Sequence, residues 1–191
     1  LVTGVQTCAL PICAGQTGTR SMTIPRDTTG GPKEGAEKIK KMKAMQDKLA
    51  AKLAGNERLA RLAKQVRMVD TSEGIRIDLV DDADFSMFQL GTTVLTSDAA
   101  RLLAVIGQTV APEAGGLTIR GHTDALPWKS GGANNWSLSA GRAEATRQAL
   151  LRQGVAEGRF ARIEGVADRE LLVKDNPQDP RNRRISILLV R

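Results

Sequence analysis

The sequence contains no tyrosine, one histidine (His122) and two cysteines (Cys8 and Cys13). Zinc hydrolases usually hold their metal with two or three histidines, so a single histidine argues strongly against that class. A Ser-His-Asp enzyme would have to use His122, but no Gly-x-Ser-x-Gly motif occurs. Both cysteines lie within the first 13 residues, so the rest of the chain offers no disulfide framework. No run of 18 apolar residues occurs, and the sequence therefore predicts no transmembrane helix.

The excess positive charge is confined to the first part of the chain. The 191 residues include 28 Lys or Arg and 21 Asp or Glu, a formal net charge of +7. Residues 1–70 hold 13 basic and 6 acidic side chains, whereas residues 71–191 hold 15 of each. Residues 14–70 also contain no aromatic side chain on which nucleic-acid bases could stack. We therefore expect no nucleic-acid partner.

Residues 1–32 predict an N-terminal segment and linker rather than a folded unit. The chain begins with Leu rather than Met, so we expect it to be part of a longer protein. Residues 1–13 are interpreted either as non-native, vector-derived sequence or as a lipoprotein cleavage box ending at Cys13. The bulky Ile12 and the lack of a basic segment followed by a long apolar one argue against the second interpretation. Residues 14–32 are rich in Gly, Thr, Ser and Pro, which is typical of a flexible linker.

Residues 33–66 predict a helical linker. Apolar residues recur there at steps of three or four, as on one face of a helix: Ile39, Met42, Met45, Leu49 and Leu53. Lysines fill most of the remaining positions. After a break at Gly55-Asn56, a second short helix is expected to carry Leu59, Leu62 and Val66. Such a basic amphipathic segment either lies on anionic lipid or packs its apolar stripe on the next domain or a partner, and we favour packing.

Residues 67–191 predict one α/β domain, a two-layer α+β sandwich, because strand-like and helix-like patterns alternate. Period-two alternation predicts strands, with a hairpin turn at Glu73-Gly74, over residues 66–68, 75–79, 117–121, 160–165 and 184–190. Helices are expected over 96–110 and 135–153, the second of them ending before Gly154.

Three segments together resemble one family: Leu117–Asp124 with Gly-His-Thr-Asp, Asn135–Ala143 with Asn-x-x-Leu-Ser-x-x-Arg-Ala, and Asn182–Ile187 with Asn-Arg-Arg. Their order and spacing are similar to those of the OmpA-like peptidoglycan-binding domain. Within that family, the stretch Gly74–Asp81 and the amphipathic segment before it resemble flagellar motor stator B subunits (the MotB family). The resemblance implies a βαβαβ-type domain and the periplasmic part of a stator subunit whose transmembrane helix is not in this chain.

Asp124 and Arg142 are the leading candidates for ligand binding. A stem peptide of peptidoglycan can end a side chain in a zwitterion, as in diaminopimelate, and recognition needs an anion and a cation close together. We expect Asp124 to accept from the ligand ammonium and Arg142 to bind the carboxylate with its planar fork. The resemblance implies the same two residues. The alternative is an internal Asp124–Arg142 salt bridge without a ligand.

Six further residues are weaker candidates. Thr123 and Asn135 are expected to hydrogen-bond the ligand backbone, although Asn135 is equally compatible with a role as helix N-cap only. Leu138 is expected to pack in the core and to touch the ligand. The resemblance places Arg183 at the rim of the pocket. It also places Phe88-Gln89 where many relatives have Phe-Asp, so Gln89 is expected to weaken one contact to the ligand amine.

Other residues near this site are given structural roles. His122 stands alone at a strand end without a nucleophile or second metal ligand, so we expect no catalysis from it. Trp136 is expected in the core, while Trp128 is assigned either to the core or to stacking on sugar rings. The loop over residues 125–134 is longer than a tight connection requires and is a candidate lid.

These observations favour a non-catalytic anchor that binds the peptidoglycan stem peptide and fixes a flagellar motor stator to the cell wall. We expect no cofactor, a homodimer, and a stator A subunit as partner through the transmembrane segment outside this chain. The alternative is a general tether, of the outer-membrane or lipoprotein type. A cell-wall enzyme is disfavoured because no metal or nucleophile set is present in the sequence.

Overall fold

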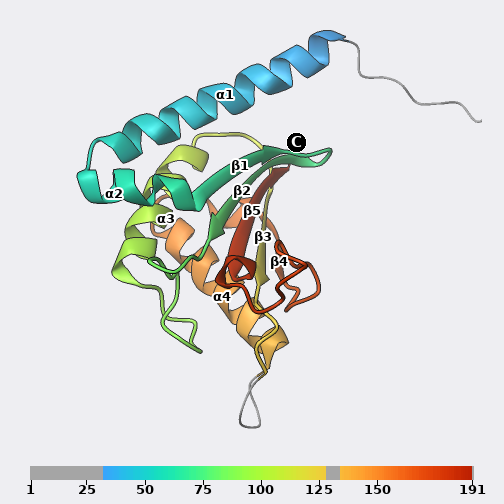
Figure 1. Ribbon diagram of the computed structural model, residues 1–191. Coiled ribbons are helices and arrows are strands. Elements are labelled where there is room, and N and C mark those ends of the chain that lie inside the picture. The colour runs from blue at the N-terminus through green and yellow to red at the C-terminus, as the bar shows by residue number, and fades with distance from the viewer. Residues whose placement is uncertain (1–31, 128–133, 191) are drawn as a thin grey trace, which may run out of the picture.

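A computed structural model describes residues 32–127 and 134–190. The expectations for the first 31 residues lie outside this range. The described chain forms a five-stranded sheet in the order β1-β2-β5-β3-β4 (Figure 1). Its strands are β1 (Val66–Asp70), β2 (Gly74–Val80), β3 (Leu117–His122), β4 (Phe160–Gly165) and β5 (Arg184–Val190). Neighbouring strands are antiparallel except β3 and β4, which run parallel.

The helices α3 (Ser97–Val110) and α4 (Asn135–Leu151) complete the expected two-layer α/β sandwich. Ile77, Ile187 and Ile119 lie opposite one another across β2, β5 and β3, and each is at most 1% exposed. Burial of one such side chain contributes about 1.5–3 kcal/mol. Because side chains alternate along a strand, the intervening residues of the same strands lie on the other face of the sheet, and several of these are charged.

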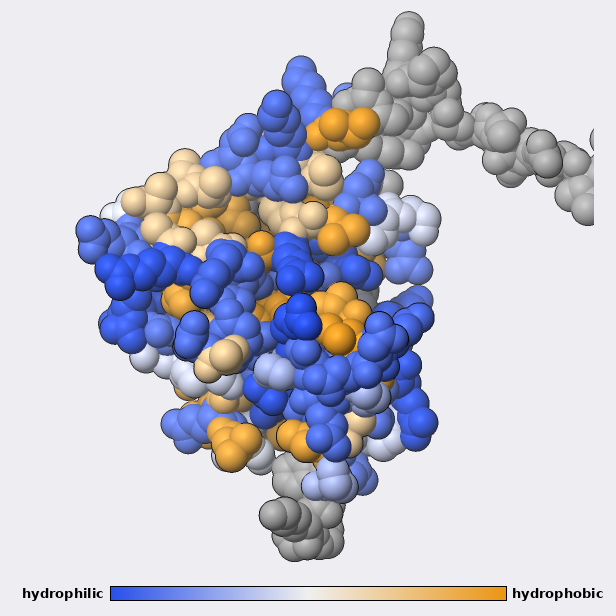
Figure 2. Space-filling model, viewed as in Figure 1, coloured by the Kyte–Doolittle hydropathy of each residue, from blue (hydrophilic) through white to orange (hydrophobic). Residues whose placement is uncertain are grey.

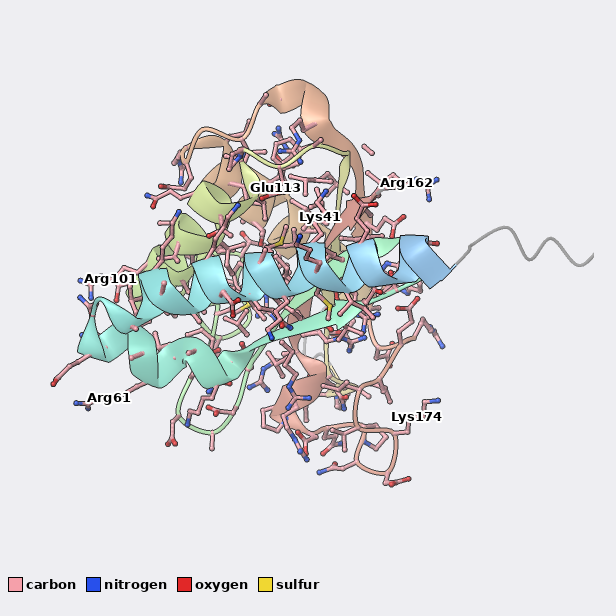
Figure 3. The ribbon with its side chains drawn as sticks, turned by 90° about the horizontal axis from the view of Figure 1, so that it is seen from above. Lys41, Arg61, Arg101, Glu113, Arg162 and Lys174 are labelled. Atoms are coloured by element: carbon pink, nitrogen blue, oxygen red, sulfur yellow. The ribbon has the colours of Figure 1, made fainter. Side chains whose placement is uncertain are left out.

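The basic amphipathic segment folds as α1 (Pro32–Ala54), which packs on α3 and β1. Met45, Leu49 and Leu53 are at most 4% exposed and belong to the hydrophobic core. Ile39, nearer the start of the helix, is 60% exposed. The favoured interpretation, packing on the next domain, is therefore correct for the second half of the helix. Figure 3 shows α1 lying across the rest of the molecule.

The chain returns from α1 to the sheet through α2 (Glu57–Leu62) and one 3-10 turn, η1 (Ala63–Gln65). The sequence patterns assigned Val66 both to this second helix and to the first strand. The strand assignment is correct, because Val66 is extended and pairs with Leu79 in the β1–β2 ladder.

Apolar residues that remain at the surface appear as separate small areas on the largely hydrophilic face of Figure 2.

The beginning of α4 corrects one further expectation. The N-cap is Asn134, whose side chain accepts from the backbone N–H of Ser137, and Ser137 completes a capping box by accepting from the Asn134 N–H. Asn135 is instead the first residue of the helix, so its side chain is not needed for capping. The helix ends at Leu151, two residues earlier than expected, and Gly154 follows with a φ of +88°.

Candidate functional site

The site lies where β3 ends and α4 begins. After His122 the backbone of Thr123 donates to the Ala167 carbonyl at 3.0 Å, which holds the strand end against the loop following β4. Asn135 Nδ2 donates to the backbone carbonyl of Asp124 at 3.2 Å. The side chain of Asn135 therefore ties the start of the helix to the strand end, and this contact fixes where the Asp124 carboxylate is presented.

Two glycines let α4 approach the sheet closely enough to reach this point. A Cβ on Gly121 would lie 2.1 Å from the Ser139 carbonyl oxygen, and one on Gly165 would lie 2.4 Å from the Ala140 nitrogen. No side chain fits in either gap. The backbone of α4 therefore rests directly on β3 and β4, and Arg142, about two turns into the helix, is carried to the same end of the sheet.

A cavity of about 410 Å³ opens at this end of the molecule. Six of the eight residues expected at the site line it: Thr123, Asp124, Asn135, Leu138, Arg142 and Arg183. Four residues of the surrounding loops complete the lining, and three of these are apolar: Leu90, Gly91, Leu126 and Pro127. The arrangement thus combines polar groups at the base with an apolar rim, as is common in small-ligand sites.

Asp124 makes its internal ion pair with Arg183 rather than with Arg142. Arg183 Nη1 lies 2.9 Å from Asp124 Oδ2, and its Nε lies 3.1 Å from Asp81 Oδ2. The guanidinium therefore bridges two carboxylates that are nearly buried. These contacts raise the pKa of Arg183 against the opposing effect of burial. The alternative of an internal Asp124–Arg142 salt bridge is wrong.

Asp81 is a site residue that the sequence interpretation left in an acidic loop. It directly follows β2 and is 3% exposed. Its Oδ1 accepts from the Met87 N–H at 2.8 Å, and its Oδ2 accepts from Ser86 Oγ at 3.0 Å. Burial raises the pKa of this carboxyl, and the bonds to Met87 and Arg183 oppose that rise. The sequence did contain one indication of this role, because Asp81 follows a buried strand much as Asp124 does.

Arg142 is 5% exposed, and no Asp or Glu carboxylate among the described residues lies within 4 Å of its guanidinium, the limit for a salt bridge. Its Nε donates to the Thr92 carbonyl at 3.0 Å, and its guanidinium carbon lies 4.9 Å from the centre of the Phe88 ring. Burial lowers the pKa of Arg142, and the nearby charge of Arg183 adds to this effect, while Asp81 and Asp124 oppose it. A buried cation in this setting is suited to binding an external carboxylate.

The turn after Phe88 supplies the backbone contact of Arg142. The Gln89 N–H donates to the Val94 carbonyl at 2.9 Å, and the Gln89 carbonyl accepts from the Thr92 N–H at 3.0 Å. The Gln89 side chain is exposed and is not among the residues lining the cavity. Phe88 is buried beneath Arg142 rather than in the cavity wall.

Two other expected residues, Leu138 and Thr123, line the cavity, and Leu138 departs from the expected core position. Leu138 is half-buried and lines the cavity instead of the core. The hydroxyl of Thr123 is buried and has no hydrogen-bond partner among residues 32–127 and 134–190, so its hydrogen-bonding capacity is unused in that part of the chain.

The expectation that Trp136 lies in the core is wrong. Its side chain is 49% exposed, and the guanidinium of Arg169 lies 5.8 Å from the ring centre. Trp128 and most of the candidate lid, residues 128–133, lie outside the described residues.

Within the part of the chain that the structure describes, no three or more His, Cys, Asp or Glu side chains are grouped to hold a metal ion. No helix in the same part is both long and apolar enough to cross a membrane.

The fold and the cavity define an α/β domain that brings a buried arginine and two nearly buried carboxylates to one end of its sheet. Residues 87–184 match the OmpA family, which is about half of the chain. The chain therefore belongs to the OmpA family.

Two proteins of Escherichia coli K12 are similar in sequence. A truncated flagellar export/assembly protein, LafU, is 30% identical over 173 residues, which cover 88% of this chain and 82% of LafU. Motility protein B is 31% identical over 159 residues, which cover 80% of this chain and 49% of that protein. This chain thus spans about half the length of Motility protein B. The structure of a MotB like protein from Desulfovibrio vulgaris has the same fold, with a TM-score of 0.65 at 20% identity, covering 82% of this chain and 98% of that one.

Proposed function

We propose that this domain binds the stem peptide of peptidoglycan without catalysis and so anchors a flagellar motor stator to the cell wall. The observation that carries the proposal is the pairing of charges in the 410 Å³ cavity. Arg142 is a buried cation that has no carboxylate partner among the described residues, and Asp124 lies in the wall of the same cavity. This pair matches a ligand that presents a carboxylate and an ammonium group together.

In the proposed complex, Arg142 binds the ligand carboxylate. Its Nε is already held by the Thr92 carbonyl and its plane rests on Phe88, so the guanidinium is oriented before the ligand arrives. A pre-oriented planar fork can bind a carboxylate through two parallel hydrogen bonds, which a lysine cannot do.

In the same complex, the Asp124 carboxylate accepts a hydrogen bond from the ligand ammonium group. Its Oδ2 is held by Arg183, whereas its Oδ1 accepts only a long 3.4 Å bond from the Leu126 N–H among the contacts of the described residues. A carboxylate oxygen can accept more than one hydrogen bond, so Oδ1 has capacity for the ligand amine. Thr123 and Asn135 bond the ligand backbone, while Leu138 and Arg183 form the wall around it.

The wider assignment rests on the sequence relatives. Because Motility protein B is among them, we propose that residues 67–191 form the periplasmic wall-binding domain and that residues 33–66 link it to the membrane. The transmembrane segment that contacts a stator A subunit lies outside this chain, and the domain works as a homodimer. A wall-bound stator needs this connection because rotor torque would otherwise drag it round.

Sedimentation of the protein with purified sacculi tests the proposal. Arg142→Ala and Arg142→Lys should each weaken binding roughly tenfold or more, since a bidentate charge-assisted pair is lost. Arg162→Ala is the matched control, because Arg162 is 74% exposed on β4 and does not line the cavity (Figure 3). Circular dichroism checks that each variant is folded.

Two further measurements make the test specific. Soluble stem peptide containing diaminopimelate should compete with sacculi, whereas the same peptide with lysine, which lacks the second carboxylate, should compete poorly. No soluble muropeptides should be released on incubation. Unchanged sedimentation of both Arg142 variants would refute the assignment of the site, and release of muropeptides would refute the non-catalytic role.

A further inference from the structure

A second cavity, of about 210 Å³, lies on the sheet face opposite α3 and α4. Its floor consists of residues from β2, β3 and β5, and its walls are the β1–β2 turn at Thr71–Glu73 and the loop carrying Glu170. It shares no lining residue with the cavity of Asp124 and Arg142.

Three arginines line this second cavity, and two of them are paired. Arg76 lies 3.0 Å from Asp78, and Arg120 lies 2.7 Å from Glu164 and 3.2 Å from Glu170. Arg184 has no carboxylate within 4 Å among the described residues; its Nη2 donates to the backbone carbonyl of Glu170 at 2.7 Å. Its Nη1 is buried and has no hydrogen-bond partner in the same part of the chain. The third arginine therefore keeps an unused donor in the cavity wall.

His122 contributes an unused acceptor beside it. It lies directly opposite Arg184 in the β3–β5 ladder and is 2% exposed. Ser186 Oγ donates its proton to Asp78 Oδ1 at 2.6 Å, so it can only accept from His122 Nε2, 3.4 Å away. This arrangement places the ring proton on Nε2 and leaves Nδ1 as an acceptor, and Nδ1 has no partner among the described residues.

The electrostatic environment agrees with this assignment. Burial, together with the smaller effect of the charges of Arg184, Arg120 and Arg76, lowers the pKa of His122 to about 3. The ring is therefore neutral at physiological pH. Burial also lowers the pKa of Arg184, with Arg76 and Arg120 adding to the effect against Asp78 and Glu170. Glu73 and Glu170 also line the cavity, and Arg76 and Arg120 are already paired with carboxylates, so an anion would act mainly on the charge of Arg184.

We propose that this cavity binds a small soluble oxyanion that also carries a hydroxyl group, such as hydrogen phosphate. An oxygen of the oxyanion accepts a hydrogen bond from Arg184 Nη1, and the hydroxyl of the same ion donates a hydrogen bond to His122 Nδ1. A volume of 210 Å³ exceeds that of a single water several-fold, so an ion of this size fits.

Titration of the full chain with inorganic phosphate, followed by NMR of ¹⁵N-labelled protein, tests the proposal. Saturable shifts should appear at the amides of Ser72, Arg76 and Glu170, with a dissociation constant on the order of 1 mM. Sulfate offers the same charge but carries no proton at neutral pH. It should bind roughly fivefold more weakly, because the hydrogen bond to His122 is not made.

Three variants make the test decisive. Arg184→Gln should weaken phosphate binding roughly tenfold, whereas Arg162→Gln, on the exposed part of β4, should leave it unchanged. Leu126→Ala, in the wall of the 410 Å³ cavity and away from the second one, should also leave it unchanged, so failure of this site is distinguishable from failure of the wall-binding site. Absence of saturable shifts in the wild-type protein, or equal binding by Arg184→Gln and Arg162→Gln, would overturn the proposal. Equal affinity for phosphate and sulfate would overturn the role of His122.

Discussion

Helix α1 should contribute strongly to stability through the buried half of its apolar stripe. Leu49 is 4% exposed within the core, so Leu49→Ala removes buried methyl groups and leaves a cavity between α1 and α3. Such substitutions cost about 2–5 kcal/mol, and we expect about 3 kcal/mol here. The nearby Lys48–Glu113 ion pair, with Lys48 59% exposed, adds little to the attachment of the helix.

Ile39→Ala is the matched control on the same helix. Ile39 is 60% exposed, so its truncation should change the free energy of unfolding by no more than about 0.5 kcal/mol. For a folded chain of this size, a 3 kcal/mol loss corresponds to a fall in Tm of about 6–12 °C. Urea and thermal unfolding, followed by circular dichroism, measure both variants against the unmodified protein. Equal and small effects of the two substitutions would mean that α1 does not pack on α3 in solution, and the reasoning would be refuted.

Two further predictions concern the helix that carries Arg142. Gly121→Ala places a Cβ about 2.1 Å from the Ser139 carbonyl oxygen, so it should destabilise the fold by roughly 2 kcal/mol or more and weaken sedimentation with sacculi. Gly158→Ala is the control and should have neither effect, because a Cβ there meets no atom within 4 Å. The contacts of Arg147 and Gln148 lower the pKa of Glu144 to about 2, below its ordinary value of 4.5. The stabilisation from ionised Glu144 is therefore fully present above about pH 4.5 and is lost as the pH falls through about 2. Glu144→Gln should lower the free energy of unfolding in urea by about 0.5 kcal/mol at pH 7, a small effect because Glu144 is 40% exposed. The difference from the unmodified protein should vanish near pH 2. A difference that stays constant with pH would contradict this account.

Much of the sheet could be predicted because strand alternation is a local property. Ile75, Ile77 and Leu79 alternate with polar residues, and the last strand begins with the same alternation before it becomes wholly apolar, so burying one face helps to fix the register of both strands. The helix ending at Val110 and the turn before Gly74 also follow from local chemistry, namely a Thr96 cap and a glycine at the hairpin. The boundaries of α4 were less predictable, because Asn134 and Asn135 are both suitable N-caps and only the capping box with Ser137 decides between them.

The candidate site was predictable to the extent that its residues lie in short sequence motifs. Six residues chosen from those motifs do line one cavity. The exposed position of Trp136 was not predictable, because a large aromatic residue at the start of a helix can face either the sheet or solvent. Asp81 was missed because an acidic run after a strand is usually a solvated loop, whereas here burial against Met87 and Arg183 gives one of its members a different role.

Local sequence patterns are sufficient to predict the alternation of the strands, the apolar stripe of α1 and the neutral charge of the domain that follows it. Short motifs likewise place Asp124 at the end of a strand and Arg142 in the helix that follows. Which arginine pairs with Asp124 depends on tertiary contacts that these patterns do not contain. Asp124 and Arg183 are 59 residues apart, and their 2.9 Å contact depends on how β5 enters the sheet between β2 and β3. The same strand order places Arg184 opposite His122 on the other face. An ion pair or a cavity depends on distances of a few ångströms between segments remote in sequence, and local patterns do not contain those distances.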